Sequence, residues 1–129
     1  MVVAGEEGVV KYALLIYTPE EARERATPEA VEQTYELYAR FAREFGDRIL
    51  GGEELQPITS ATTVRLQGGP DGDLLTTDGP FAETKEQLAG FYLIEAADLD
   101  EAIRVAGRVP SAAYGSIEVR PVAPGPPAE

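Results

Sequence analysis

The sequence predicts an α+β fold of the ferredoxin-like type, a split β-α-β unit into which a β-hairpin is inserted. Two observations predict it. The expected elements follow the order β-α-β-(β-hairpin)-β-α-β along a chain of 129 residues, which is the length of one domain. The central strands are apolar on both faces, whereas the two expected long helices can cover only one face of the sheet. We therefore expect a second copy of the chain to cover the other face, in a homodimer.

The first strand is expected over residues 9–17, where two largely apolar sets of side chains alternate. Thr18-Pro19-Glu20-Glu21 has the pattern of a capping box with Thr18 as the N-cap, and it predicts a short helical turn. Thr27-Pro28 begins the main helix, which is expected to end near Phe45 because Gly46 follows. Apolar positions spaced by three and four residues predict the buried stripe of this helix: Val31, Tyr35, Leu37, Tyr38, Phe41, Ala42 and Phe45.

Strands are then expected over residues 48–55 and 61–67, and the second of them pairs in a hairpin with residues 73–77. Residues 83–88 are expected to form one helical turn before a strand over 89–96. Asp98-Leu99-Asp100-Glu101 resembles a second capping box and predicts a helix that ends near Gly107. The last strand is expected over residues 116–120, and the buried face of the second helix is expected to hold Leu99, Ala102, Ile103 and Ala106.

The single domain is expected to span residues 9–121, between a flexible N-terminal tail at 1–8 and a Pro-rich C-terminal tail at 122–129. The first ten residues carry two glutamates and lack the basic region of a signal peptide. The apolar runs are far shorter than the ~20 residues that span a bilayer. These features predict a cytoplasmic protein.

The composition excludes several classes of function. Lys and Arg total 11 against 23 Asp and Glu, so the net charge is −12, which disfavours nucleic acid and anionic membranes as partners. The chain has no histidine and no cysteine, so it holds no Ser-His-Asp triad, thiolate zinc site or imidazole metal ligand. Asp71-Gly72-Asp73 lacks the further ligands of a calcium loop and is interpreted as a hairpin turn. We expect neither a metal nor a cofactor.

One stretch carries a specific resemblance. Residues 77–88, TDGPFAETKEQL, are followed by Gly90-Phe91-Tyr92-Leu93-Ile94, and Gly51-Gly52-Glu53 precedes them in the expected place. Over residues 9–122 the chain resembles the DGPF-domain proteins of the YCII-related superfamily. The resemblance implies a bacterial protein that forms a dimeric α+β barrel and whose function is poorly characterised. Many such proteins are encoded beside extracytoplasmic-function sigma factors, and the wider superfamily includes a muconolactone dehalogenase. The superfamily is also associated with a His-Asp pair, which this histidine-free chain does not contain.

Asp78 is the candidate catalytic residue. It ends a strand at a tight turn, where a carboxylate can face a cleft and act as a general base. The other interpretation is that these residues only form a turn. Asp78 then accepts hydrogen bonds from nearby backbone N–H groups, Gly79 allows a wide range of its own φ, and the ring of Pro80 fixes the φ of Pro80. Any acid–base chemistry in a chain without histidine must rely on carboxylates, lysine or tyrosine.

Four further side chains are candidate ligand-binding residues: Tyr17, Glu53, Arg65 and Lys85. Glu53 is preferred to Glu54 because neighbours on a strand face opposite sides and Glu53 directly follows two glycines. Arg65 would bind a substrate carboxylate, Lys85 would serve as a cationic anchor, and Tyr17 would lend its hydroxyl to a pocket. The alternative is structural: Glu53 caps a bulge or pairs with Arg65, the two cations are solvated, and Tyr17 belongs to the core.

The predicted function is the binding of an unknown small molecule by a dimeric cytoplasmic protein, with lyase or isomerase activity if Asp78 acts as a base. The alternative is a non-catalytic accessory or regulatory protein associated with sigma-factor signalling. The two hypotheses differ in geometry. An enzyme should bring Asp78 together with Glu53 or Arg65 in one concave pocket, whereas scattered exposed side chains favour the second hypothesis.

Overall fold

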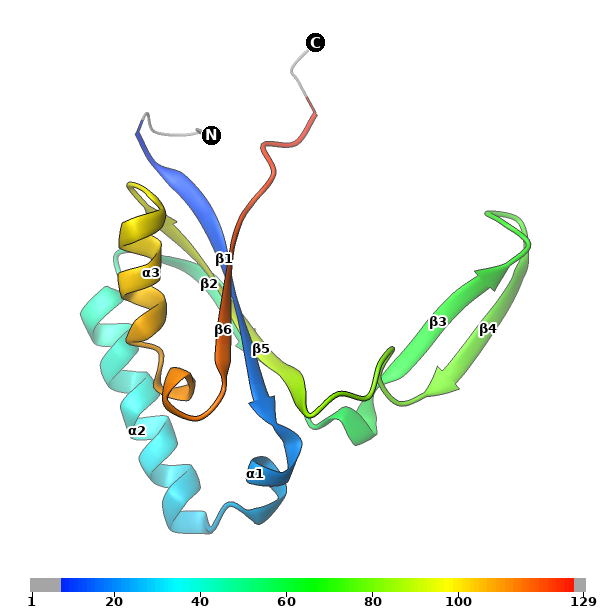
Figure 1. The fold of residues 1–129 in the computed structure, drawn as a ribbon, viewed down its shortest axis with the longest axis horizontal. Helices are drawn as coiled ribbons and strands as arrows, with labels where there is room; N and C mark the ends of the chain where they lie inside the picture. Colours follow the sequence, from blue (N-terminus) through cyan, green and yellow to red (C-terminus); the bar gives the residue numbers. More distant parts are fainter. Residues whose placement is uncertain (1–7, 127–129) are drawn as a thin grey trace.

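The computed structural model describes residues 8–126, and its architecture is the predicted ferredoxin-like α+β fold (Figure 1). One antiparallel four-stranded sheet has the order β2-β5-β1-β6. Its strands are β1 (Val10–Pro19), β2 (Ile49–Glu54), β5 (Glu86–Ala96) and β6 (Ser116–Pro121). The first and third strands of the split unit, β1 and β5, form the centre of the sheet because both are long and apolar on both faces.

Two helices pack on one face of this sheet, α2 (Pro28–Phe45) and α3 (Leu99–Gly107) (Figure 1). The side chains of β1 that face them, Tyr12, Leu14 and Ile16, are buried, and Leu14 is 0% exposed. The core continues through Ile94 of β5, Phe41 of α2 and the small residues of α3. Alternate side chains of β1 point to the opposite face, which no helix of the described residues covers, and they are partly exposed.

The helix start predicted at Thr27-Pro28 and the N-cap predicted at Asp98 are both confirmed. The Thr27 hydroxyl accepts a hydrogen bond from the Ala30 N–H at 3.1 Å, and the Asp98 carboxylate accepts one from the Glu101 N–H at 2.9 Å. The capping box predicted at Thr18 is wrong. β1 continues to Pro19, so the short helix α1 (Glu20–Arg25) begins without a side-chain cap, and Thr18 is buried in the sheet instead.

The buried stripe predicted for α2 is correct only in part. Phe41 is buried, and Tyr38 and Phe45 pack partly against the core. Tyr35, in contrast, is 56% exposed, and Val31 and Leu37 are exposed as well. The N-terminal half of α2 stands away from the sheet, so the apolar pattern of the helix continues beyond the part of the core that it can reach.

The prediction of which residues of α3 are buried is also wrong in part. Ala102 and Ala106 are buried as predicted, but the third buried residue is Val105, and Leu99 and Ile103 are about half exposed. The buried positions are spaced by three and four residues, as a helix face requires. The helix is therefore rotated about its axis relative to the predicted orientation, and it turns its smallest side chains toward the sheet.

The inserted hairpin forms a sheet of its own, with β3 (Thr62–Gln67) paired to β4 (Asp73–Asp78). It projects away from the body of the molecule (Figure 1). Its exposed side chains include four large apolar ones: Val64, Leu66, Leu74 and Leu75. The helical turn predicted at residues 83–88 is wrong, because Glu86 already pairs with Pro19 as the first residue of β5.

Two short 3-10 helices complete the chain, Ile58–Ser60 and Pro110–Ala113 (η1 and η2). Residues 122–125 of the predicted C-terminal tail form neither helix nor strand. The predicted tail at residues 1–8 lies outside the described residues except for Gly8, as do residues 127–129. Among residues 8–126, no helix is both long and apolar enough to cross a membrane.

Candidate functional site

A cavity of about 840 Å³ lies where the N-terminal half of α2 stands away from the sheet. Helix α1, the C-terminal ends of β1 and β2, the middle of β5 and the η2 segment form its other walls. The lining is mainly apolar, with side chains that include Ile16, Ala22, Ala30, Val31, Pro57, Ala89 and Tyr92. Polar groups meet the cavity in two clusters, one charged and one made of hydroxyl groups. An apolar hollow with a few convergent polar groups is the usual form of a small-molecule site.

The charged cluster lies between α1, α2 and β2. The Tyr35 hydroxyl donates a hydrogen bond to Glu54 Oε1 at 2.9 Å, and Arg23 Nη2 lies 4.0 Å from Glu54 Oε2. The same Arg23 nitrogen donates to the carbonyl oxygen of Leu55 at 2.8 Å, which fixes the guanidinium. The hydrogen bond to Glu54, together with the negative charge of that carboxylate, raises the pKa of Tyr35 above its ordinary value.

The hydroxyl cluster joins α2 to the η2 segment. The Tyr38 hydroxyl lies 2.6 Å from Ser111 Oγ, which in turn lies 3.3 Å from the Tyr114 hydroxyl. Ser111 is buried, whereas Tyr114 is half exposed at the edge of the cavity. Burial raises the pKa of Tyr38 above its ordinary value, so this phenol keeps its proton at neutral pH.

Thr18 adds a hydroxyl group without a partner. Its side chain lines the cavity, the residue is only 4% exposed, and its Oγ1 makes no hydrogen bond within the described part of the chain. A buried hydroxyl without a partner costs about 1–3 kcal/mol. Such groups are few in folded proteins. This oxygen has almost no accessible surface, so it is enclosed by the sheet and does not face the open cavity.

A glycine allows β2 to approach β5 beside the cavity. Gly52 has φ +156, and a Cβ at this position would collide with the carbonyl oxygen of Phe91. The close approach places Glu54 opposite Gly90, on the face of the sheet that carries the helices. Of the adjacent glycines that the sequence singled out, Gly51 has open space around it, so only Gly52 is required by the packing.

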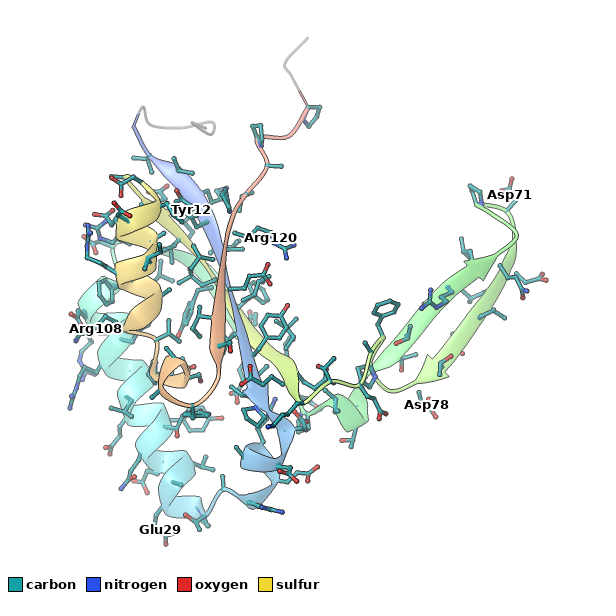
Figure 2. All side chains as sticks on the ribbon, viewed as in Figure 1. Tyr12, Glu29, Asp71, Asp78, Arg108 and Arg120 are labelled. Atoms are coloured by element: carbon teal, nitrogen blue, oxygen red, sulfur yellow. The ribbon has the colours of Figure 1, made fainter. Side chains whose placement is uncertain are left out.

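Asp78, the predicted catalytic residue, ends β4 opposite Thr62 and is exposed. It lies near the base of the projecting hairpin, with Asp71 at the tip (Figure 2). Two hydrogen bonds hold the turn that follows it: the Gly79 N–H donates to the Ala61 carbonyl at 2.7 Å, and the Thr63 hydroxyl donates to the Gly79 carbonyl at 2.9 Å. The Gly79 φ of +100 fits the role in the turn that the sequence predicts for this glycine.

The four predicted ligand-binding residues are dispersed. The Arg65 guanidinium lies 4.9 Å from the ring centroid of Phe81, and Lys85 is exposed in the loop before β5. Tyr17 belongs to the uncovered face of the sheet, opposite to the face of Ile16. Glu53 alone borders the cavity, and its strand neighbour Glu54 is the one that bonds to Tyr35. In the single chain, therefore, these residues and Asp78 do not surround one hollow.

Apart from Glu53, the sequence analysis did not single out as site residues the polar side chains that surround the cavity. Tyr35 and Tyr38 are at helical spacing and were assigned to the core, and Thr18 was assigned to a cap. One signal was available: the two phenols lie three residues apart on one helix, and buried phenols need hydrogen-bond partners. Their partners, Glu54 and Ser111, lie 19 and 73 residues further along the chain, which the local pattern does not reveal.

Comparisons with known proteins give a family for this chain. The family model described as the YCII-related domain matches residues 10–125. The chain is also 40% identical over 116 residues to the uncharacterized protein R00369 of Rhizobium meliloti (strain 1021), a match that covers 87% of this chain and 91% of the relative. The narrower resemblance to DGPF-domain proteins is consistent with this family.

Proposed function

The chain belongs to the YCII-related family, and we propose that it is a small-molecule-binding member whose ligand occupies the cavity between α1, α2 and the sheet. The observation that carries the proposal is the mainly apolar cavity of about 840 Å³, which the tyrosines Tyr35, Tyr38 and Tyr114 line. A ligand there would bury its apolar body and bond to the few polar groups that meet the cavity.

We also propose that the functional unit is a homodimer. The uncovered face of the central sheet presents Ala13, Leu15, Phe91 and Leu93 as partly exposed neighbours, since Leu15 pairs with Phe91 and Ala13 with Leu93. A second sheet packed on this face would bury them. The exposed apolar side chains of the β3–β4 hairpin support the same proposal, because a lone two-stranded hairpin needs packing partners to be stable.

A catalytic version of this function, of the lyase or isomerase type, needs a carboxylate base at the ligand. Within the single chain, Glu54 meets that requirement better than Asp78, since it lines the cavity and its Oε1 accepts a hydrogen bond from the Tyr35 hydroxyl at 2.9 Å. For Asp78 to act, the partner chain would have to bring a ligand to the hairpin base. The cytoplasmic location stays a prediction from the sequence.

The alternative function, a non-catalytic accessory protein associated with sigma-factor signalling, is favoured by one observation. The five residues predicted from the sequence to form a site lie apart from one another, and Asp78, Arg65 and Lys85 are exposed. This is the arrangement that we expected of a protein without a catalytic centre.

A thermal-shift screen of a metabolite library tests the cavity. Compounds that stabilise the native chain should lose most of their effect in Tyr38→Phe or Glu54→Gln and keep it in Asp78→Asn. Tyr17→Phe, on the uncovered face of the sheet, and Asp71→Asn, at the hairpin tip, are the matched controls. Hits that are abolished only by Asp78→Asn would move the site to the hairpin. If no compound shifts the melting temperature, the binding function is refuted and the accessory function is favoured.

A further inference from the structure

The β3–β4 hairpin has one apolar face, and we propose that this face packs against the second copy of the chain in the dimer. The inference rests on the proposed homodimer and assigns the hairpin a contact in it. Residues directly opposite each other in an antiparallel pair share a face. The register pairs Val64 with Thr76 and Leu66 with Leu74, so the three large apolar side chains lie together. Each of the three is half exposed or more in the single chain.

The other face of the hairpin is mainly polar. By the same register it carries Thr63, Arg65, Gln67, Asp73, Leu75 and Thr77. A strand pair that is apolar on one face and polar on the other is typical of an antiparallel sheet that packs on a second layer. Every residue of β4 is exposed in the single chain, so the layer that the apolar face requires must come from another chain.

The direction of the hairpin indicates which partner it meets. It extends on the side of the sheet opposite to α2 and α3, which is the side of the uncovered face (Figure 1). Arg120, which lies opposite Ala13 on the uncovered face, points to the same side (Figure 2). A body packed on the uncovered face therefore lies beside the hairpin. The two apolar surfaces of the chain thus belong to one contact region.

The uncovered face itself favours a second copy as that body. Its centre is apolar, with Leu15 opposite Phe91, and its edges carry charged residues of both signs: Lys11, Glu53, Glu95, Glu118 and Arg120. An apolar centre with a polar rim is the usual form of a protein interface. A uniformly acidic rim would repel its own copy, whereas mixed signs allow self-complementary pairing. In a two-fold dimer each hairpin then reaches the other chain.

The base of the hairpin is held firmly enough to present this face. The buried Gln87 side chain donates from Nε2 to the carbonyl oxygens of Ala82 at 2.9 Å and Thr84 at 3.3 Å. These bonds fix the segment between β4 and β5. A surface that is ordered before binding loses less conformational entropy when it docks. Asp78 lies on the same face as Val64, at its base, so docking places this carboxylate beside the partner.

Thiol labelling tests which face of the hairpin docks. The chain has no cysteine, so a single introduced thiol can be followed alone. Thr76→Cys places it on the apolar face and Thr77→Cys on the polar face, and both positions are exposed in the single chain. In the dimer, the thiol at position 76 should react with a maleimide about tenfold or more slowly than the thiol at position 77. In the dilute monomer the two rates should be similar. Equal rates in the dimer would overturn the docking face.

A charge placed on each face provides the matched test of energy. Leu74→Glu should weaken self-association by about tenfold or more, because it buries a carboxylate in the contact. Gln67→Glu adds the same charge to the polar face and should leave self-association unchanged. Sedimentation velocity measures both. Neither change should lower the melting temperature of the dilute monomer, because both side chains are exposed there.

The outcomes separate this inference from the homodimer on which it rests. A dimer that Leu93→Glu dissociates and Leu74→Glu does not would overturn the role of the hairpin and keep the contact between sheets. Dissociation by Gln67→Glu alone would place the partner on the polar face and also overturn the inference. A wild-type chain that stays monomeric at micromolar concentration would refute both proposals.

Discussion

The two faces of strand β1 are similar in sequence and different in the folded chain. Tyr12, Leu14 and Ile16 lie under α2 and α3 and are buried, whereas Leu15 and Tyr17, on the opposite face, stay partly exposed. An apolar sequence is therefore compatible with burial of a strand face, but burial also requires another element of the chain to pack on that face. On the first face the covering is itself incomplete, and the cavity lies at its incomplete end.

The largest expected effect is on the covered face. Leu14→Ala should reduce the free energy of unfolding by about 2–5 kcal/mol, because the side chain is fully buried and its removal leaves a void. Leu15→Ala, the matched change on the uncovered face, should cost about 1 kcal/mol or less when the chains are monomeric. Chemical denaturation at low protein concentration measures both, and equal losses there would contradict the proposed difference between the faces.

The next largest effect is on self-association, which we propose to bury the uncovered face of the sheet. Leu93→Glu should weaken self-association by about 100-fold or more, because a carboxylate buried between two sheets has no counter-charge. Ile103→Glu, an equally large change on the exposed side of α3, should leave self-association intact. Sedimentation velocity over a range of concentrations measures both. A wild-type chain that stays monomeric at micromolar concentration would refute the dimer.

A smaller effect is expected at the edge of the cavity. Gly52→Ala should cost about 1–3 kcal/mol, because the added methyl group would collide with the Phe91 carbonyl oxygen at a φ of +156. Gly51→Ala, in open space on the same strand, is the control and should be nearly neutral. Thermal or chemical unfolding measures the difference. If the two variants are equally stable, the close approach of β2 to β5 is not required for the fold.

The smallest effect is a dependence on pH that belongs to the covered face alone. The pKa of Tyr38 is raised by burial, so the folded state favours the protonated phenol. The unfolded chain therefore loses this proton first, and the stability that the group contributes, complete below about pH 10, should decline as the pH rises through the higher folded pKa. Denaturation curves of wild type and Tyr38→Phe should converge above pH 10. If the stability difference between the two proteins does not change with pH, the raised pKa of Tyr38 does not contribute to the pH dependence.

The sequence analysis recovered the fold because its signals are local. Alternating strands, the helix start at Thr27-Pro28, the N-cap at Asp98 and the hairpin turns each depend on a few neighbouring residues. It failed where a distant element decided the outcome. Thr18 has the type and spacing of an N-cap, yet pairing with Gln87 of β5 extends the strand through it. Tyr35 has the spacing of a core residue, yet it borders the cavity, is 56% exposed and reaches the sheet only through its hydroxyl bond to Glu54.

The candidate site was harder to predict than the fold for the same reason. Of its polar contacts, the bond from Tyr35 to Glu54 spans 19 residues and that from Tyr38 to Ser111 spans 73. Neither pair forms a motif in the sequence. The sequence favoured Glu53 because of the two preceding glycines, and only the register of β2 on β5 brings Glu54 to the helix side of the sheet.

The sequence by itself determined the order and type of most elements, the family, and the exclusion of histidine and cysteine chemistry, because composition and short-range periodicity are properties of the chain alone. Only the tertiary structure decided which face of the sheet is covered, where α2 stands away from it, and which hydroxyl groups meet at the cavity. These depend on the directions in which the helices cross the sheet, and those directions result from the packing of side chains far apart in sequence.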